Sequence, residues 1–195
     1  MLFRSSLDER QERNRFAAQG AIKIGTAFID RGRCLPWAMD RPCIVCQENC
    51  PVSPKAIRTR QTFNTIHTGA ALVVARADAM YIEFQATAPG ADRFATGDYY
   101  CVVPTSADHR PRRIVSSWER GLKIAEGLPF ESLPSPGSLV EIQIRLQQPY
   151  VDPEHCIGCG VCEHECPVPG QRAIRVTADN ESRAREHALL LELST

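Results

Sequence analysis

The organisation of this chain is decided by one stretch of sequence, Cys156-Ile157-Gly158-Cys159-Gly160-Val161-Cys162-Glu163-His164-Glu165-Cys166-Pro167. Three cysteines follow one another at two-residue gaps, and the fourth comes after a three-residue gap, directly before proline. One tight loop can direct three thiolates at three corners of a tetrahedral Fe4S4 cube, but it cannot reach the fourth corner. Gly158 and Gly160 ease such a loop because glycine adopts backbone angles that other residues avoid. Cys166 is therefore expected to bind a different cluster.

An incomplete copy of the same arrangement lies upstream, as Cys43-x2-Cys46-x3-Cys50-Pro51. The position three residues before Cys43 is Asp40 instead of cysteine, and the nearest upstream cysteine is Cys34. Each copy is flanked by short apolar segments, at residues 27–30 and 56–58 in the first and at 149–152 and 173–175 in the second. Each half is therefore interpreted as a short strand, a cysteine loop and a short strand. Two such halves can pair into a small sheet.

Because the fourth cysteine of each run points away from its own loop, the two halves are expected to exchange ligands. The first cluster would then be held by Cys156, Cys159, Cys162 and Cys50. The second would be held by Cys43, Cys46, Cys166 and either Cys34 or Asp40. Thiolate is the softer and better iron ligand, which favours Cys34 over Asp40.

The nine cysteines also admit other interpretations. An odd number in short clusters favours metal ligation over a disulfide framework. A zinc-stabilised interaction module is one alternative, although zinc normally takes two separated CxxC pairs. A redox sensor with one labile cluster is another, if Asp40 or water completes the second site. Cys101 stands apart in an apolar segment and is expected to be buried in a strand.

Composition excludes several classes of function. Lys+Arg and Asp+Glu are equal at 23 each, so no net charge favours nucleic acid or an anionic membrane. No catalytic serine–histidine–aspartate set, phosphate loop or dinucleotide-binding glycine run is present, so we expect an electron carrier that is not itself an enzyme. No run approaches the about 20 apolar residues of a transmembrane helix, and residues 1–15 lack the apolar stretch of a secretory signal. A cytoplasmic location without membrane insertion is expected.

The cysteine runs resemble those of two-cluster bacterial-type ferredoxins. Together with Arg31-Gly32-Arg33-Cys34-Leu35-Pro36-Trp37 and Asn180-Glu181-Ser182-Arg183, they resemble the C-terminal half of polyferredoxin-like proteins associated with periplasmic nitrate reductase and methylamine dehydrogenase. The resemblance covers roughly residues 22–58 and 147–183. It implies two [4Fe–4S] clusters and redox protein partners, such as a membrane-associated oxidoreductase. It also implies a periplasmic location if this chain is a shortened form of that family.

The expected fold class is α+β, a ferredoxin-type two-cluster module with a mainly β insertion between the cysteine motifs. The expected parts are an N-terminal helical segment (1–21), the first half of the module (22–58), the β-rich insertion (59–146), the second half (147–178) and a C-terminal helical tail (179–195). Within the insertion, strands are expected at 70–74, 80–84, 98–103 and 139–145, and a short helix at 116–126.

Overall fold

The computed structural model describes residues 22–88 and 91–182. The chain divides into two compact units. The first, here called the cysteine unit, comprises residues 1–34, 44–59 and 149–195, and the second, the barrel unit, comprises 35–43 and 60–148. The predicted N-terminal helix (1–21) and most of the predicted C-terminal helical tail (183–195) lie outside the described residues. The domain boundaries expected from the sequence stay a prediction.

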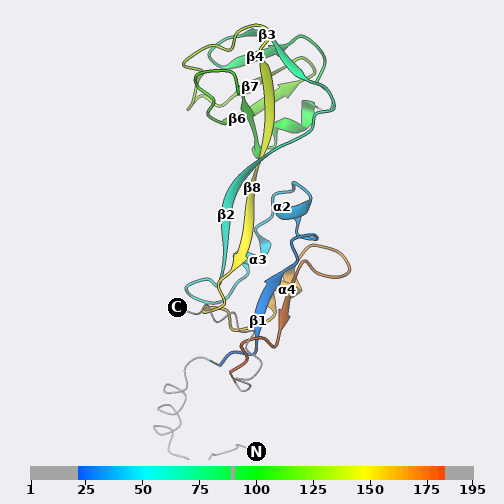
Figure 1. The fold of residues 1–195 in the computed structure, drawn as a ribbon, viewed down its shortest axis with the longest axis vertical. Coiled ribbons are helices and arrows are strands. Elements are labelled where there is room, and N and C mark those ends of the chain that lie inside the picture. The colour runs from blue at the N-terminus through cyan, green and yellow to red at the C-terminus, as the bar shows by residue number, and fades with distance from the viewer. Residues whose placement is uncertain (1–21, 89–90, 183–195) are drawn as a thin grey trace, which may run out of the picture. The chain divides into compact units, whose positions relative to one another are not determined.

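The cysteine unit contains a two-stranded antiparallel sheet formed by the outermost strands of the two halves. Strand β1 (Thr26–Ile29) pairs with β9 (Ile174–Thr177) (Figure 1). In this pair Ala27 lies opposite Val176. Two short helices, α3 (Val45–Glu48) and α4 (Val161–Glu165), contact each other, and α4 also contacts β9. The strand that opens the first half therefore pairs with the strand that closes the second half. The expected small sheet is confirmed in this form.

The barrel unit is built from strands that close on themselves. Its strands are β3 (Leu72–Ala77), β4 (Tyr81–Phe84), β5 (Tyr99–Val102), β6 (Arg112–Trp118), β7 (Gly121–Ile124) and β8 (Leu139–Val151). They are neighbours in the order β8-β3-β4-β7-β6-β5, and β5 pairs again with β8. Strand β2 (Ile57–Thr65) also pairs with β8 (Figure 1). This closure leaves the six ring strands without a free edge.

The barrel has an apolar interior because its strands alternate inward and outward residues. Along β8, Val140, Ile142, Ile144 and Leu146 are buried, whereas Leu139 is 51% exposed. The fully buried side chains of the barrel core include Val74, Ile82, Cys101, Val103, Ile114, Leu122 and Ile124. Cys101 is therefore the buried strand cysteine expected from the sequence. Two further elements complete the unit, helix α2 (Leu35–Ala38) and the 3-10 helix η1 (Ala91–Ala95).

The expected fold, an α+β ferredoxin-type two-cluster module, is wrong, because the described residues are mostly β. The described residues form two sheets, and the three α-helices have only four, four and five residues. The strands expected at 70–74, 80–84, 98–103 and 139–145 are confirmed as β3, β4, β5 and β8.

The predicted helix at 116–126 is also wrong, because these residues form the β6–β7 hairpin. Trp118 pairs with Gly121 across its turn. A Cβ on Gly121 would lie 2.6 Å from both the Ile82 carbonyl oxygen and the Trp118 ring, so glycine is needed where these strands meet. Residues 116–120 are polar apart from Trp118, and they masked the strand pattern in which Ile114, Leu122 and Ile124 face the core.

Among residues 22–88 and 91–182, no helix has the length and apolar character required to cross a bilayer.

Candidate metal centre

Asp152 folds the residues that lead into the first cysteine of the second run. Its carbonyl oxygen accepts a hydrogen bond from the Cys156 amide (3.0 Å), and its carboxylate accepts one from the Glu154 amide (3.0 Å). The second carboxylate oxygen lies 2.8 Å from Nδ1 of His155. The hydrogen bond from His155 is the main reason why the pKa of the Asp152 carboxyl group is lowered. The turn before Cys156 is thus fixed by the backbone and side chain of one residue, Asp152.

The loop between Cys156 and Cys159 packs directly on the backbone that precedes β1. The Ile24 amide donates a hydrogen bond to the Ile157 carbonyl oxygen (2.9 Å). Gly158 has φ +71°, and a Cβ at this position would lie 2.5 Å from the Gly25 nitrogen. Glycine is therefore required at position 158 for two reasons: the backbone is left-handed there, and it packs closely against Gly25. This agrees with the role expected for a glycine in this loop.

Helix α4 carries Cys162 inward and is attached to β9. Gly160 precedes the helix with φ +79°. Cys162 is 5% exposed, and the carboxylate of Glu163 accepts a hydrogen bond from the Val176 amide (2.8 Å). Because Val176 lies opposite Ala27 in the sheet, this bond ties the cysteine loop to both strands.

Four of the predicted ligands line one cavity. Cys156, Cys159 and Cys162 come from the second run, and Cys50 comes from the first run. The remaining wall of the cavity is mostly apolar and is formed by Ala27, Pro51, Val52, Ala56, Ile57, Ile157, Gly158, Gly160 and Val176. Cys50, Cys156 and Cys162 are buried, whereas Cys159 is exposed. The structure thus brings together the set that was expected for the first cluster.

The electrostatics of this cavity reflect the crowding of its thiols. Burial, followed by the proximity of Cys156 and Cys159, raises the pKa of Cys162 to about 11, and Cys50 adds to the rise. Thiolates held this close together repel one another, and a bound metal cluster would supply the positive charge that offsets this repulsion. One sulfur also receives a backbone hydrogen bond, because the buried Ala27 amide donates to Cys156 Sγ at 3.3 Å.

These features fit an iron–sulfur cluster. Four sulfur donors are the ligands that Fe–S clusters take, apolar walls lower the local dielectric, and an amide–sulfur hydrogen bond is the kind of contact that sets cluster potential. In the described part of the chain, no three His, Cys, Asp or Glu side chains are gathered in a way that could hold a single metal ion. None of the nine cysteines, all of which are described, forms a disulfide.

The second predicted set is distributed over both units. Cys34, Cys46 and Cys166 are buried residues of the cysteine unit, whereas Cys43 is half-buried on the segment 35–43 of the barrel unit. The grouping of these four thiols stays a prediction. The alternative ligand, Asp40, is exposed, and its carboxylate accepts a hydrogen bond from Asn64 (2.8 Å).

Local contacts position two cysteines of the second set. The Cys34 amide donates to the Asp30 carbonyl oxygen (3.1 Å), which folds the turn after β1. The Arg172 guanidinium donates to the carbonyl oxygens of Cys166 and Val168, both at 2.8 Å. A positive charge is thereby held beside the backbone of Cys166.

Sequence reasoning missed three groups at these sites. Gly25 makes the close approach to Gly158, the Ala27 amide bonds the Cys156 sulfur, and Arg172 holds the chain after Cys166. Of these three, only Gly25 could have been recognised in the sequence, because it is a glycine that directly precedes an apolar strand. Backbone donors and long-range contacts leave no pattern in the residue types.

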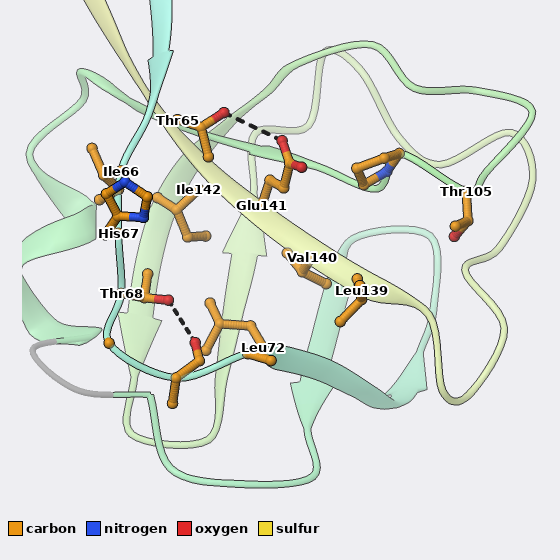
Figure 2. Close-up of a pocket in the computed structure, with 14 residues that line it drawn as sticks. Thr65, Ile66, His67, Thr68, Leu72, Thr105, Leu139, Val140, Glu141 and Ile142 are labelled. Atoms are coloured by element: carbon orange, nitrogen blue, oxygen red, sulfur yellow. Dashed lines mark hydrogen bonds between the residues drawn. The ribbon is translucent and has the colours of Figure 1, made fainter.

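A separate groove lies on the barrel unit and contains no cysteine. It is lined by residues 65–72, 104–105 and 139–142. The Thr65 hydroxyl donates a hydrogen bond to the Glu141 carboxylate (3.3 Å), and the Thr68 hydroxyl donates one to the Ala70 carbonyl oxygen (2.7 Å). Dashed lines mark hydrogen bonds of Thr65 and Thr68 in Figure 2.

Comparison with known proteins identifies one segment of the chain. Residues 147–168 match the family of 4Fe-4S binding domains. The match contains Cys156, Cys159, Cys162 and Cys166 and thus the whole second run. Neither the curated proteins nor the solved structures gave a match. Residues 147–168 therefore carry a 4Fe–4S binding motif of the ferredoxin type, which supports an iron–sulfur electron-transfer role.

Proposed function

We propose that this protein transfers single electrons through two [4Fe–4S] clusters and serves as a subunit or soluble partner of a larger oxidoreductase, without catalysing a reaction itself. One observation carries the proposal. Cys50, from the first cysteine run, lines the same cavity as Cys156, Cys159 and Cys162 from the second. With this cysteine spacing, two clusters can each have four ligands only if each run supplies one cysteine to the other run's cluster.

Each group of the first site has a definable part in this function. A bound [4Fe–4S] cluster supplies reversible one-electron chemistry. The thiolates of Cys50, Cys156, Cys159 and Cys162 would hold the cluster in place. The Ala27 amide directs positive partial charge at one sulfur, and the apolar wall keeps water from most of the cavity. Cys159 is the exposed ligand and leaves the site open to solvent on one side.

The second cluster is assigned to Cys34, Cys43, Cys46 and Cys166. The burial of Cys34, Cys46 and Cys166 supports this set. The Asp40 carboxylate is engaged by the Asn64 amide, which supports Cys34 over Asp40 as the fourth ligand. Thiolate is also the better iron ligand.

Anaerobic reconstitution with iron and sulfide tests the proposal. We expect a brown protein with iron and sulfide for two [4Fe–4S] clusters and a broad visible absorbance that bleaches on reduction. A colourless protein that retains zinc would instead establish a zinc-stabilised module. Loss of one iron per chain on brief exposure to air would point to a sensor with a labile cluster.

The fourth ligand of the second cluster is tested by two variants of the same segment. Cys34→Ala is expected to lose the second cluster and retain the first, because a cube held by only three thiolates exposes one iron. Asp40→Ala is the matched control and is expected to retain both. The assignment is wrong if iron and sulfide analysis gives the opposite result.

A further inference from the structure

The turn that carries Cys34 and the loop that follows Cys166 meet at one end of the β1–β9 pair. Asp30, directly after β1, donates its amide to the carbonyl oxygen of Ala173, directly before β9 (2.7 Å). The Cys34 amide donates to the Asp30 carbonyl oxygen (3.1 Å) and closes the turn. Because β1 and β9 are antiparallel, the segment after β1 lies beside the segment before β9. Two ligands assigned to the second cluster therefore belong to neighbouring segments of the cysteine unit.

The side chain of Arg33 joins these two segments. Its Nε donates to the Gln171 carbonyl oxygen (2.9 Å), and one terminal nitrogen donates to the Pro169 carbonyl oxygen (3.5 Å). Arg33 directly precedes Cys34, and its own amide donates to the Asp30 carbonyl oxygen (3.1 Å). The neighbour of one predicted ligand thus holds the loop that follows another.

A second arginine, Arg172, holds the same loop. Its Nη1 donates to the carbonyl oxygens of Cys166 and Val168, both at 2.8 Å. One nitrogen therefore bonds the backbone of the ligand residue itself and that of the second residue after it. Carbonyl oxygens at four positions of residues 166–171 are held by the two guanidinium groups, two by each.

The two arginines bring charge to this loop as well as hydrogen bonds. A guanidinium group stays protonated at any pH at which the protein is folded. Among residues 22–88 and 91–182, no carboxylate lies within ion-pair distance of Arg33 or Arg172. The carboxylate of the nearby Asp30 accepts a hydrogen bond from the Gly32 amide (3.0 Å). The loop after Cys166 is therefore held by two positive charges whose bonded partners are neutral carbonyl groups.

We propose that Arg33 and Arg172 are positioning residues of the second cluster, which fix the loop that places Cys166 and raise the reduction potential of that cluster. The proposal rests on the proposed function, since it requires a cluster on the second set of cysteines. Reduction adds one negative charge to a cluster, and a positive charge beside it stabilises the reduced state. The arginine pair thus makes the second cluster a better electron acceptor than it would be beside a neutral loop.

The experiment is a redox titration of the full, anaerobically reconstituted chain, followed by electron paramagnetic resonance. Dithionite is oxidised to sulfite and supplies the electrons through mediator dyes, and each [4Fe–4S] cluster gains one electron as it is reduced. Cys50→Ala, expected to keep only the second cluster, and Cys34→Ala, expected to keep only the first, assign the two reduction steps. Iron and sulfide are measured first, so that failure of cluster binding is recognised separately.

Substitution by glutamine and by lysine separates charge from hydrogen bonding. Arg33→Gln and Arg172→Gln keep a donor but remove the charge, and each should lower the equilibrium constant for reduction of the second cluster about tenfold, because a nearby unit charge inside a protein has an effect of this order. For one electron this is a fall of about 59 mV in potential. Arg33→Lys and Arg172→Lys keep the charge and should stay close to wild type.

Two internal references accompany these variants. The potential of the first cluster should be unchanged in all four, because the arginines contact only the loop that follows Cys166 and the turn before Cys34. Arg113→Gln removes the same charge at an exposed position of the barrel unit and should leave both potentials at the wild-type values.

Three results would overturn the proposal once wild type has been found to bind two clusters. The first is a second-cluster potential in both glutamine variants that equals that of wild type. The second is an equal fall for both clusters. The third is a fall in the lysine variants as large as that in the glutamine variants, which would exclude charge as the cause. A wild type with one cluster or none would instead contradict the proposed function.

Loss of the second cluster from a variant also gives a clear answer. If Arg172→Gln fails to bind it, Arg33→Gln, which leaves both bonds of Arg172 in place, gives the same comparison. If both glutamine variants lose it, the lysine variants decide. Retention of the second cluster at the wild-type potential in these variants supports the proposal, whereas its loss there would reduce the two arginines to packing of the loop.

Discussion

The backbone amide of Ala27 faces the sulfur of Cys156, whereas its methyl group is buried against the cysteine loop. In an antiparallel pair, alternate residues direct their amides to the partner strand. The Asp30 amide bonds the Ala173 carbonyl oxygen (2.7 Å), so the even-numbered residues of β1 face β9 and Ala27 faces the cavity. Proline at position 27 would therefore remove the amide–sulfur bond and leave the hydrogen bonds between β1 and β9 in place.

Ala27→Pro is expected to lower the reduction potential of the first cluster. A hydrogen bond to sulfur favours the reduced state, which carries more negative charge, so its loss disfavours adding an electron. The shift should be on the order of tens of millivolts, as for one hydrogen bond to a charged group. A redox titration followed by electron paramagnetic resonance measures it. Ala27→Gly retains the amide and is the control, and an equal shift in both variants would exclude the hydrogen bond as the cause.

Gly158 and Gly160 both have positive φ, but their surroundings differ. A Cβ on Gly158 would lie 2.5 Å from the Gly25 nitrogen, whereas open space surrounds Gly160. Gly158→Ala is expected to displace the loop and lose the first cluster. Gly160→Ala should retain it and lose only about 1–2 kcal/mol of stability through backbone strain. Iron analysis and thermal unfolding distinguish the two, and retention of full iron by Gly158→Ala would contradict the close packing on Gly25.

Among the elements, the loops before β6 and after β7 are joined by a buried arginine. Arg112 is 1% exposed, bonds the Asp108 carboxylate and donates to the carbonyl oxygens of Arg110 (3.0 Å) and Pro129 (3.3 Å). Its guanidinium carbon lies 4.3 Å from the centre of the Phe130 ring. Arg112→Ala should destabilise the barrel unit by about 3 kcal/mol, because it leaves buried acceptors without a donor. Chemical denaturation followed by tryptophan fluorescence measures the change, and Arg113→Ala, at an exposed neighbour, is the control.

Asp108, in the loop before β6, makes the stability of the fold depend on pH. The hydrogen bond from Arg110, and then the one from Arg112, lower the pKa of the Asp108 carboxyl group well below its ordinary value. A carboxyl group with a lowered folded-state pKa contributes stability above its unfolded pKa of about 4, and this contribution falls as pH drops toward the folded value. The unfolding midpoint of wild type should therefore decrease below pH 4. Asp108→Asn should show a smaller decrease over this range. If its pH profile is the same as that of wild type, the decrease cannot be assigned to Asp108.

The elements also show what sequence patterns could predict. The strands around residues 72–77, 81–84 and 99–102 were predictable because their apolar residues alternate or cluster between turn residues. The β6–β7 hairpin was not, since Ser116, Ser117, Glu119 and Arg120 resemble an exposed helix. The pairing of β5 with β8 closes the barrel between segments about 40 residues apart, and no local pattern records such a contact.

At the scale of the whole molecule, the internal repeat predicted one group of four cysteines that the structure brings together, but it did not predict the fold class. Cluster geometry limits which cysteines one loop can supply, so the spacing alone placed Cys50 with Cys156, Cys159 and Cys162, and these four line one cavity. The class was mispredicted because the short helices around the cysteines contribute few residues, while the intervening segment forms a barrel with its own core. Packing of that core, not the cysteine pattern, decides the class.

The exchange of ligands between the two runs is the central claim, and Cys50 tests it most directly. Iron and acid-labile sulfide per chain should be compared, after anaerobic reconstitution, in wild type, Cys50→Ala and Cys101→Ala. Cys101 is the appropriate control because it is fully buried in the barrel core, where burial raises the pKa of its thiol to about 12. Cys50→Ala should lose the iron and sulfide of one [4Fe–4S] cluster and keep the other, and Cys101→Ala should match wild type. Full iron and sulfide in Cys50→Ala would contradict the account.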